Sequence, residues 1–166
     1  MTQTQILSLE RKQVVDVITE RLLLGDWRVM TLSYLAEYGD WSEEQLAQLF
    51  PSYQVLVVAV NQSLTQHFVD HLDLSSRERL RESWLESLDS SHFSAIVMLF
   101  LDASQEESVA WRLANVGWTV LSNQVAAKLG YHAVNEDLPW LLGKSMLMLV
   151  NQRKHFPTAK HTAKAG

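Results

Sequence analysis

Two histidines four residues apart are the pattern in this sequence that comes closest to a metal site. His67 and His71 would share one face of a helix, beside Asp70, at a spacing that a zinc ion can bridge. The pattern contains no fixed third ligand, so it favours a solvated helix surface over a metal site. The chain has no cysteine, which excludes thiolate ligands and disulfide bonds.

Catalytic side chains show no comparable pattern. No combination of serine, histidine and acid, and no pair of carboxylates, stands out on adjoining segments in the way that nucleophilic or acid–base catalysis requires. We therefore predict that the protein is not an enzyme and that it uses no cofactor and no metal.

A short polar segment carries the residues best suited to contact DNA. Ser42 is placed to cap a helix that runs to Leu49, and the amides of Gln45 and Gln48 on that helix can pair with adenine edges. A second short helix is predicted over residues 31–38, and the turn at 39–41 separates the two. Two short helices joined in this way are typical of a helix-turn-helix.

Two acids in the same segment oppose DNA binding. Glu43 and Glu44 would lie in the first turn of the second helix, where each costs about 1 kcal/mol or more near a polyanion. Acids are also common in first helical turns because they stabilise the helix dipole by ~0.3–1 kcal/mol. Residues 10–60 hold four basic and eight acidic side chains, and the whole chain has a formal charge of -5. Charge therefore weakens the prediction of DNA binding without removing it.

Hydrophobic periodicity predicts an all-α protein of about eight helices. Val14, Ile18 and Leu22 give one face to a first helix over 8–24. Proline 51 or the serine after it starts a long helix that ends near residue 72. Further helices are predicted over 75–88, 92–102, 106–129 and 135–152. The segment 92–102 has the composition of a strand, but the chain offers no second strand to pair with it.

Composition allows one well-buried domain, or a small head fused to a larger body, in a chain of 166 residues with 47% hydrophobic residues. The longest apolar runs, 55–60 and 95–101, are far shorter than the ~20 residues that span a bilayer. The N-terminus lacks the basic start of a signal peptide. We therefore predict a cytoplasmic protein without stable membrane insertion.

The front of the chain resembles the tetracycline repressor (TetR) family of transcriptional regulators. The resemblance rests on the turn at Gly25, the cap at Ser42, the phenylalanine-proline-serine element at 50–52, and the apolar positions Leu32, Leu35, Ala36 and Leu46. It implies a TetR-like all-α fold with a helix-turn-helix head over 1–52, a ligand-binding and dimerisation body over 53–152, and a disordered basic tail over 153–166. Family members usually carry a lysine or arginine and a glycine just after the cap, and a lysine after the phenylalanine-proline-serine element; this chain carries Glu43, Glu44 and Tyr53 there.

The function implied by the resemblance is a ligand-responsive transcriptional regulator that acts as a homodimer and contacts DNA through Ser42, Gln45, Gln48 and Tyr53. The alternative is a TetR-fold protein that has lost DNA binding and binds an apolar ligand, a lipid or a protein partner.

Large side chains in the second half of the chain suit a small apolar effector or lipid, because aromatic and methionine residues form an adaptable lining. In the TetR-like fold the corresponding helices surround an effector cavity; core filling is the alternative role for the same residues. Arg112 and Asn115 are the expected polar anchors. The complete predicted set is Trp84, Met98, Phe100, Trp111, Arg112, Asn115 and Trp118.

Dimerisation is predicted because one helix cannot cover both the segment 139–150 and the wide apolar arc of 106–129. Pairing of these two helices with the same helices of a second subunit, across a two-fold axis, would form a four-helix bundle and bury the remaining apolar surface. In a monomer, the earlier helices could instead cover that surface. The residues predicted at the interface are Leu121, Val125, Trp140, Leu141, Gly143, Leu147 and Met148.

Overall fold

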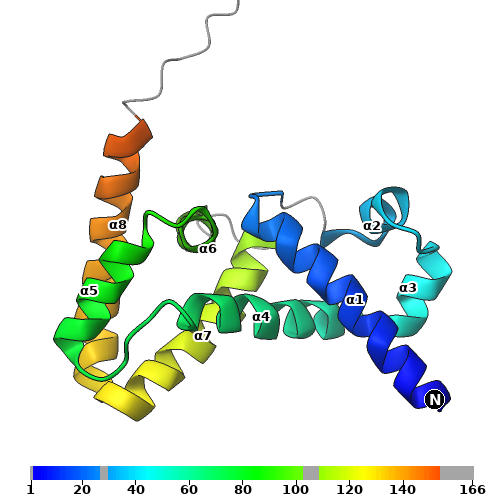
Figure 1. Cartoon of the computed structure of the whole chain (residues 1–166), viewed down its shortest axis with the longest axis horizontal. Helices are drawn as coiled ribbons and strands as arrows, with labels where there is room; N and C mark the ends of the chain where they lie inside the picture. Colours follow the sequence, from blue (N-terminus) through cyan, green and yellow to red (C-terminus); the bar gives the residue numbers. More distant parts are fainter. Residues whose placement is uncertain (1, 27–29, 103–108, 154–166) are drawn as a thin grey trace, which may run out of the picture.

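The computed structural model describes residues 2–26, 30–102 and 109–153, and within these ranges the chain is all-α (Figure 1). This confirms the predicted fold class. In chain order the elements are α1 (Gln3–Leu23), α2 (Leu32–Tyr38), α3 (Glu43–Leu49), α4 (Tyr53–Val69), α5 (Arg77–Ser87), α6 (Ser91–Asp102), α7 (Val109–Leu129), a π-helical turn (Ala133–Asp137) and α8 (Leu138–Arg153).

Side-chain caps determine where the shorter helices begin. Thr31, Ser42, Ser52 and Ser76 each accept a hydrogen bond from the backbone N–H three residues later, at the starts of α2, α3, α4 and α5. Gly25, which follows the C-terminal end of α1, has a φ of 81°, the left-handed conformation that glycine adopts without steric cost. The predicted starts and stops in this part of the chain are therefore confirmed.

The starts of two helices, α1 and α8, differ most from the prediction. Helix α1 begins at Gln3, well before residue 8, because Thr2 and Gln5 form a capping box. The last helix is preceded by the π-helical turn. Pro139, in the first turn of α8, has no N–H to donate, and the N–H of Leu138 just before it donates to the Ala133 carbonyl five residues back. Residues 103–108 and 154–166, which include the predicted start of the 106–129 helix and almost all of the predicted tail, lie outside the described residues.

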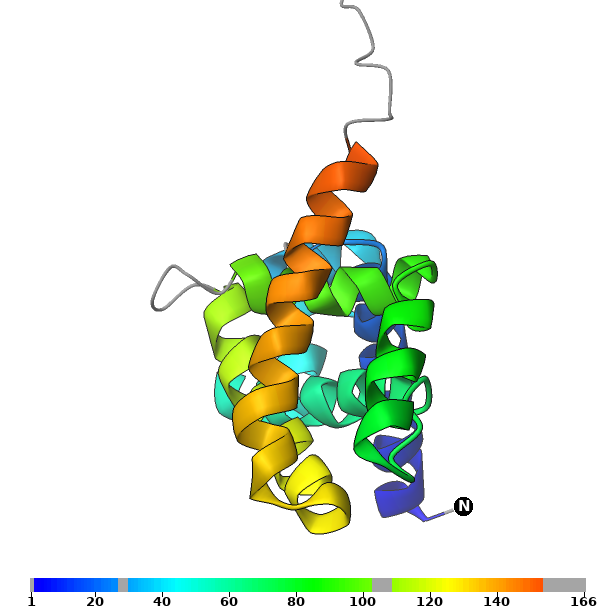
Figure 2. The ribbon, with the colours of Figure 1, turned by 90° about the vertical axis from the view of Figure 1, so that its left-hand side faces the viewer.

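Helix α4 lies between the two ends of the molecule (Figure 1). It packs against α1 on one side and α7 on the other, while α6 packs against α7 and α1. Figure 2 shows α8 along the outer face of the body with α5 beside it. Buried residues of α1, α4, α6 and α7 belong to one hydrophobic cluster. The predicted boundary between head and body, at residues 52 and 53, falls at the cap of this central helix.

No helix among the described residues is long and apolar enough to cross a membrane.

Candidate functional site

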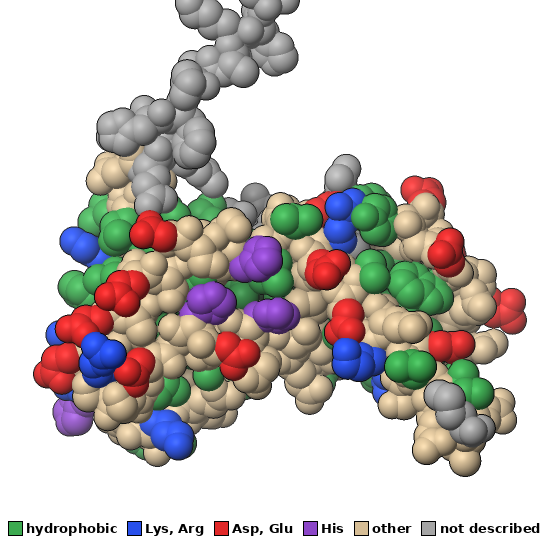
Figure 3. Space-filling view, in the orientation of Figure 1, with side chains coloured by type: hydrophobic (Ala, Val, Ile, Leu, Met, Phe, Trp, Pro, Cys, Tyr) green, Lys and Arg blue, Asp and Glu red, His purple; other side chains and the backbone are tan. Residues whose placement is uncertain are grey.

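The α2–α3 pair forms a helix-turn-helix at one end of the molecule (Figure 1). Leu35 of α2 and Leu46 of α3 are both fully buried, and they hold the pair against the rest of the head. The other side of α3 faces solvent through Glu43, Glu44 and Gln48. Figure 3 shows that acidic side chains predominate over this end of the molecule.

Two of the residues predicted to contact DNA also hold the start of α3. The Ser42 N–H donates to Gln45 Oε1 at 2.8 Å, and the Gln45 N–H donates to Ser42 Oγ at 3.2 Å. Both residues are exposed, and Gln48 is exposed near the other end of the same helix. The capping box fixes where the side chains of α3 point.

Tyr53, predicted to contact DNA, packs against Arg112 of α7. It is the first residue of α4, is 37% exposed, and its ring centroid lies 5.5 Å from the guanidinium carbon of Arg112 on α7. Burial raises the pKa of the Tyr53 phenol, and the positive charge of Arg112 opposes that rise. Sequence reasoning assigned Tyr53 to DNA and Arg112 to a ligand, and nothing in their spacing indicated that they meet.

The space between α4, α6 and α7 is nearly filled. A cavity between α4, α6 and α7 has a volume of only about 10 Å³ and is bordered by Asn61, Phe68 and Gly117, among others. That is room for about one water molecule. Among the described residues, this cavity leaves no room for an effector between α4, α6 and α7.

An open groove on the body surface brings four of the predicted ligand residues together. It has a volume of about 280 Å³, and Phe100, Trp111, Asn115 and Trp118 line it together with Ala114 and Leu142. The rings of Phe100 and Trp118 meet edge to face, with their centroids 5.5 Å apart. Sequence reasoning therefore selected residues that share one groove between α6, α7 and α8.

The remaining ligand candidates lie elsewhere. Trp84 is fully buried, stacks edge-on against Phe68 at 5.0 Å, and donates to Ser145 Oγ at 2.9 Å. It therefore packs in the core, the alternative role that the sequence left open, and it does not line the groove of Trp111 and Trp118. Met98 lines a different groove, of about 200 Å³, between α6 and α8.

The residues predicted at a dimer interface divide into two groups. Leu121, Val125 and Leu141 are at most 1% exposed, because they pack inside the protomer. They offer no surface to a partner, and the prediction for them is corrected accordingly. Met148 is half-buried against the core. Trp140, Gly143 and Leu147 are exposed along one side of α8.

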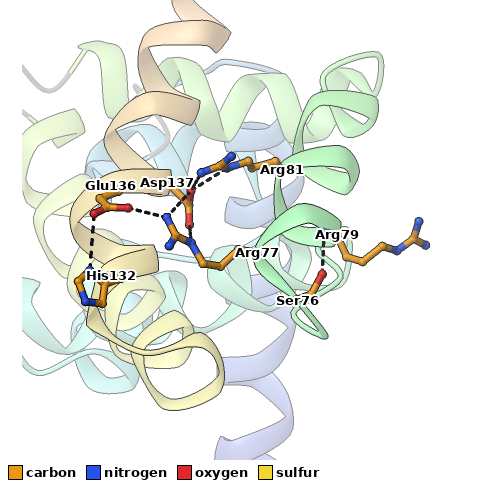
Figure 4. Close-up of polar contacts among 7 residues, drawn as sticks. All are labelled: Ser76, Arg77, Arg79, Arg81, His132, Glu136 and Asp137. Carbon is orange, nitrogen blue, oxygen red and sulfur yellow. Dashed lines mark hydrogen bonds and ion pairs between the residues drawn. The ribbon is translucent and has the colours of Figure 1, made fainter.

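A cluster of ion pairs joins α5 to the π-helical turn (Figure 4). The Asp137 side chain is fully buried and accepts from Arg77 Nε at 2.5 Å and from Arg81 Nε at 2.7 Å. Arg77 also pairs with Glu136 at 2.6 Å. Burial raises the pKa of Asp137, but the hydrogen bonds and charges of the two arginines outweigh burial and hold it below its usual range. About sixty residues separate the partners, so the sequence alone gave no signal of this cluster.

His67 and His71 contact each other at the C-terminal end of α4. His71 Nδ1 lies 2.8 Å from the carbonyl oxygen of His67, and both side chains are exposed. The described ranges contain no group of three or more histidine, aspartate or glutamate side chains that could hold a metal ion.

Comparison with known families identifies the helical body. The family model described as the tetracycline repressor LuxT C-terminal domain matches residues 61–149, which is more than half of the chain. The chain therefore belongs to the tetracycline repressor family. No curated protein matches it.

Proposed function

We propose that the protein is a ligand-responsive transcriptional regulator that binds duplex DNA as a homodimer. The observation that carries the proposal is the α2–α3 unit, whose second helix turns its outer face away from the body at one end of a TetR-family chain. In this proposal residues 1–52 are the DNA-binding head and residues 53–152 are the ligand-binding and dimerisation body. Ser42, Gln45, Gln48 and Tyr53 face the DNA.

An apolar stripe on α8 supports the homodimer. Trp140, Leu147 and Val150 are 49%, 63% and 47% exposed, and with Gly143 they recur at alternating three- and four-residue spacings. This is the repeat by which two helices pack side by side. A Cβ atom added at Gly143 would meet nothing within 4 Å in the protomer, so a partner helix has room to approach there. A symmetric dimer would place two heads on successive turns of the DNA.

The aromatic groove between α6, α7 and α8 is the proposed effector site. Its lining is mainly aromatic and aliphatic, with the Asn115 amide as a polar anchor, which suits a small apolar molecule that carries one hydrogen-bonding group. Arg112 follows Trp111 directly on α7 and contacts Tyr53 at the start of α4. A ligand that shifts α7 would thus displace a contact to the start of α4, the helix that follows the helix-turn-helix.

The test of DNA binding is a salt titration of the full chain with a fluorescently labelled duplex of mixed sequence, followed by anisotropy. The proposal predicts binding at low ionic strength, with the logarithm of the association constant falling linearly as the logarithm of salt concentration rises. Absence of binding at low ionic strength would remove the regulator function.

A second candidate function is a family member that no longer binds DNA and serves as an apolar-ligand, lipid or protein-partner module. The exposed Glu43 and Glu44 in the first turn of α3 favour it, because carboxylates there repel phosphates. Native mass spectrometry of the purified protein tests its ligand-binding form through the mass of a retained apolar molecule. A retained ligand together with no DNA binding would select this candidate.

A further inference from the structure

The side chains that line a groove beside α3 include one positive charge and no negative charge. The groove lies between the first turns of α1 and the C-terminal end of α3 and has a volume of about 340 Å³. Arg11 is the charged residue of its lining. The other lining residues are Thr4, Leu7, Ser8, Gln48, Leu49 and Pro51.

The polar side chains of this groove are hydrogen-bond donors arranged on two helices. Thr4, Ser8 and Arg11 follow one another at spacings of four and three, which places them on one face of α1. The amide of Gln48 comes from α3. Hydroxyl, amide and guanidinium groups are the side chains that contact DNA phosphates.

Arg11 is held in place without an acidic partner. Its guanidinium carbon lies 5.2 Å from the ring centroid of the buried Phe50, and its Nε is buried with no hydrogen-bond partner among the described residues. Lys12 pairs with Asp16 at 2.6 Å. Within the described ranges, Arg21 also has a ring contact and an unpartnered Nε, but its Nη2 lies 4.0 Å from Asp26, an ion pair that Arg11 lacks. Within the described part of the head, Arg11 is the basic side chain whose charge no carboxylate neutralises.

We infer that this groove binds a phosphate of the DNA backbone, with Arg11 as its cation and Thr4, Ser8 and Gln48 as neutral donors. The inference rests on the proposed DNA binding. It places this one phosphate beside the last turn of α3 and not at the first turn, where Glu43 and Glu44 stand. Helix α1 then supplies the phosphate contact that the first turn of α3 lacks.

The experiment is a salt titration of a fluorescein-labelled duplex of mixed sequence with the full-length wild type, Arg11→Met and Lys12→Met. Methionine keeps an aliphatic stem against Phe50 and removes the charge. For Arg11→Met we expect the slope of log affinity against log salt to fall in magnitude by about one. Affinity at ~50 mM salt should fall roughly tenfold, as loss of one phosphate contact implies. Lys12→Met, which removes a neighbouring charge already paired with Asp16, should retain the wild-type slope, and Arg11→Lys should restore it.

The outcomes separate this inference from the function on which it rests. If the wild type binds no duplex, the regulator function and the inference both fail. If the wild type binds and Arg11→Met keeps its slope, the inference alone is overturned. Should circular dichroism show Arg11→Met to be unfolded, the double variant Thr4→Ala/Ser8→Ala replaces it, because both residues are exposed. A several-fold loss of affinity in that variant supports the inference, and an unchanged affinity overturns it.

Discussion

Arg112 of α7 lies over the ring of Tyr53, the first residue of α4, with 5.5 Å between the guanidinium carbon and the ring centroid. The contact joins the helix that carries the aromatic groove to the helix that follows the helix-turn-helix. Cation–π contacts at partly exposed sites contribute ~0.5–1 kcal/mol. A contact of that strength can be broken and re-formed by a small shift of either helix.

The first prediction concerns the charge of Arg112. Arg112→Met should raise the pKa of the Tyr53 phenol further, because burial already raises it and the opposing positive charge is lost. The measurement is the phenolate absorbance during an alkaline titration, with Tyr53→Phe variants in both backgrounds to isolate this tyrosine. Arg112→Lys, which keeps the charge, is the matched control and should titrate close to the wild type. An unchanged Tyr53 titration in Arg112→Met would mean that the two side chains do not interact in solution.

The second prediction concerns the buried carboxylate. Asp137→Asn should lower the free energy of unfolding at neutral pH by about 1–2 kcal/mol, less than the loss of a fully buried pair because both arginines are partly exposed. The folded pKa of Asp137 lies below the unfolded value of about 3.9. The stability that ionised Asp137 contributes is therefore present above its unfolded pKa, at roughly pH 4 and higher. It is lost as the pH falls through the lower pKa of the folded state.

Urea unfolding of wild type and Asp137→Asn across that pH range measures the difference, which should shrink on acidification. Asp89→Asn, at an exposed carboxylate, serves as the control and should change stability little at any pH. A constant difference between wild type and Asp137→Asn down to low pH would contradict the ionic role of Asp137.

The third prediction compares two glycines. A Cβ atom at Gly117 would lie 2.9 Å from Oδ1 of the buried Asn61, whereas one at Gly143 would meet nothing within 4 Å. Gly117→Ala should thus destabilise the fold by about 1–2 kcal/mol through overpacking. Gly143→Ala should stabilise the protomer by up to about 1 kcal/mol through helix propensity. Thermal unfolding at low protein concentration compares the stabilities of the two variants. Equal effects would mean that the space beside Asn61 can take a methyl group at Gly117.

The fourth prediction tests the stripe on α8. Leu147→Glu should raise the dimer dissociation constant roughly 100-fold or more, because like charges would face each other across the two-fold axis. Leu24→Glu is a matched control, since Leu24 is 67% exposed and Leu147 is 63% exposed. Size-exclusion chromatography with light scattering gives the masses. If Leu147→Glu remains a dimer, the interface lies on another surface. If Leu24→Glu also loses the dimer, the loss does not depend on the α8 stripe.

The fifth prediction concerns the two acids of α3. Glu43→Gln/Glu44→Gln should strengthen duplex binding roughly tenfold or more at low ionic strength, since each carboxylate near the phosphates costs about 1 kcal/mol. The measurement is the same anisotropy titration that tests DNA binding. Glu78→Gln, on the distant α5, removes an acid with no access to the DNA and should leave affinity nearly unchanged.

Local signals predicted most of the fold. Ser42 begins a helix where the sequence placed a cap, α4 begins directly after the predicted start at residues 51–52, and Gly25 follows the end of α1. Caps and hydrophobic periodicity depend on residues within a few positions of each other, so a single sequence contains them. The early start of α1 at the Thr2–Gln5 capping box was missed because its first turns are exposed and lack an apolar stripe.

Site residues were predicted less completely. The groove at Phe100, Trp111, Asn115 and Trp118 was anticipated as a set of large side chains on neighbouring helices. The burial of Trp84 was left open, because an aromatic side chain suits a core and a binding site equally well. Which of these it joins depends on the angle at which α5 meets its neighbours, and periodicity does not contain that angle.

By itself, the sequence determined an all-α chain with a helix-turn-helix near its start, because capping and 3.6-residue periodicity are local properties. Only the tertiary structure decided that Arg112 meets Tyr53, that Arg77 and Arg81 converge on Asp137, and that side chains nearly fill the space between α4, α6 and α7. These contacts join residues about sixty positions apart. They depend on how helices cross and how side-chain volumes fit, and no short-range pattern records either.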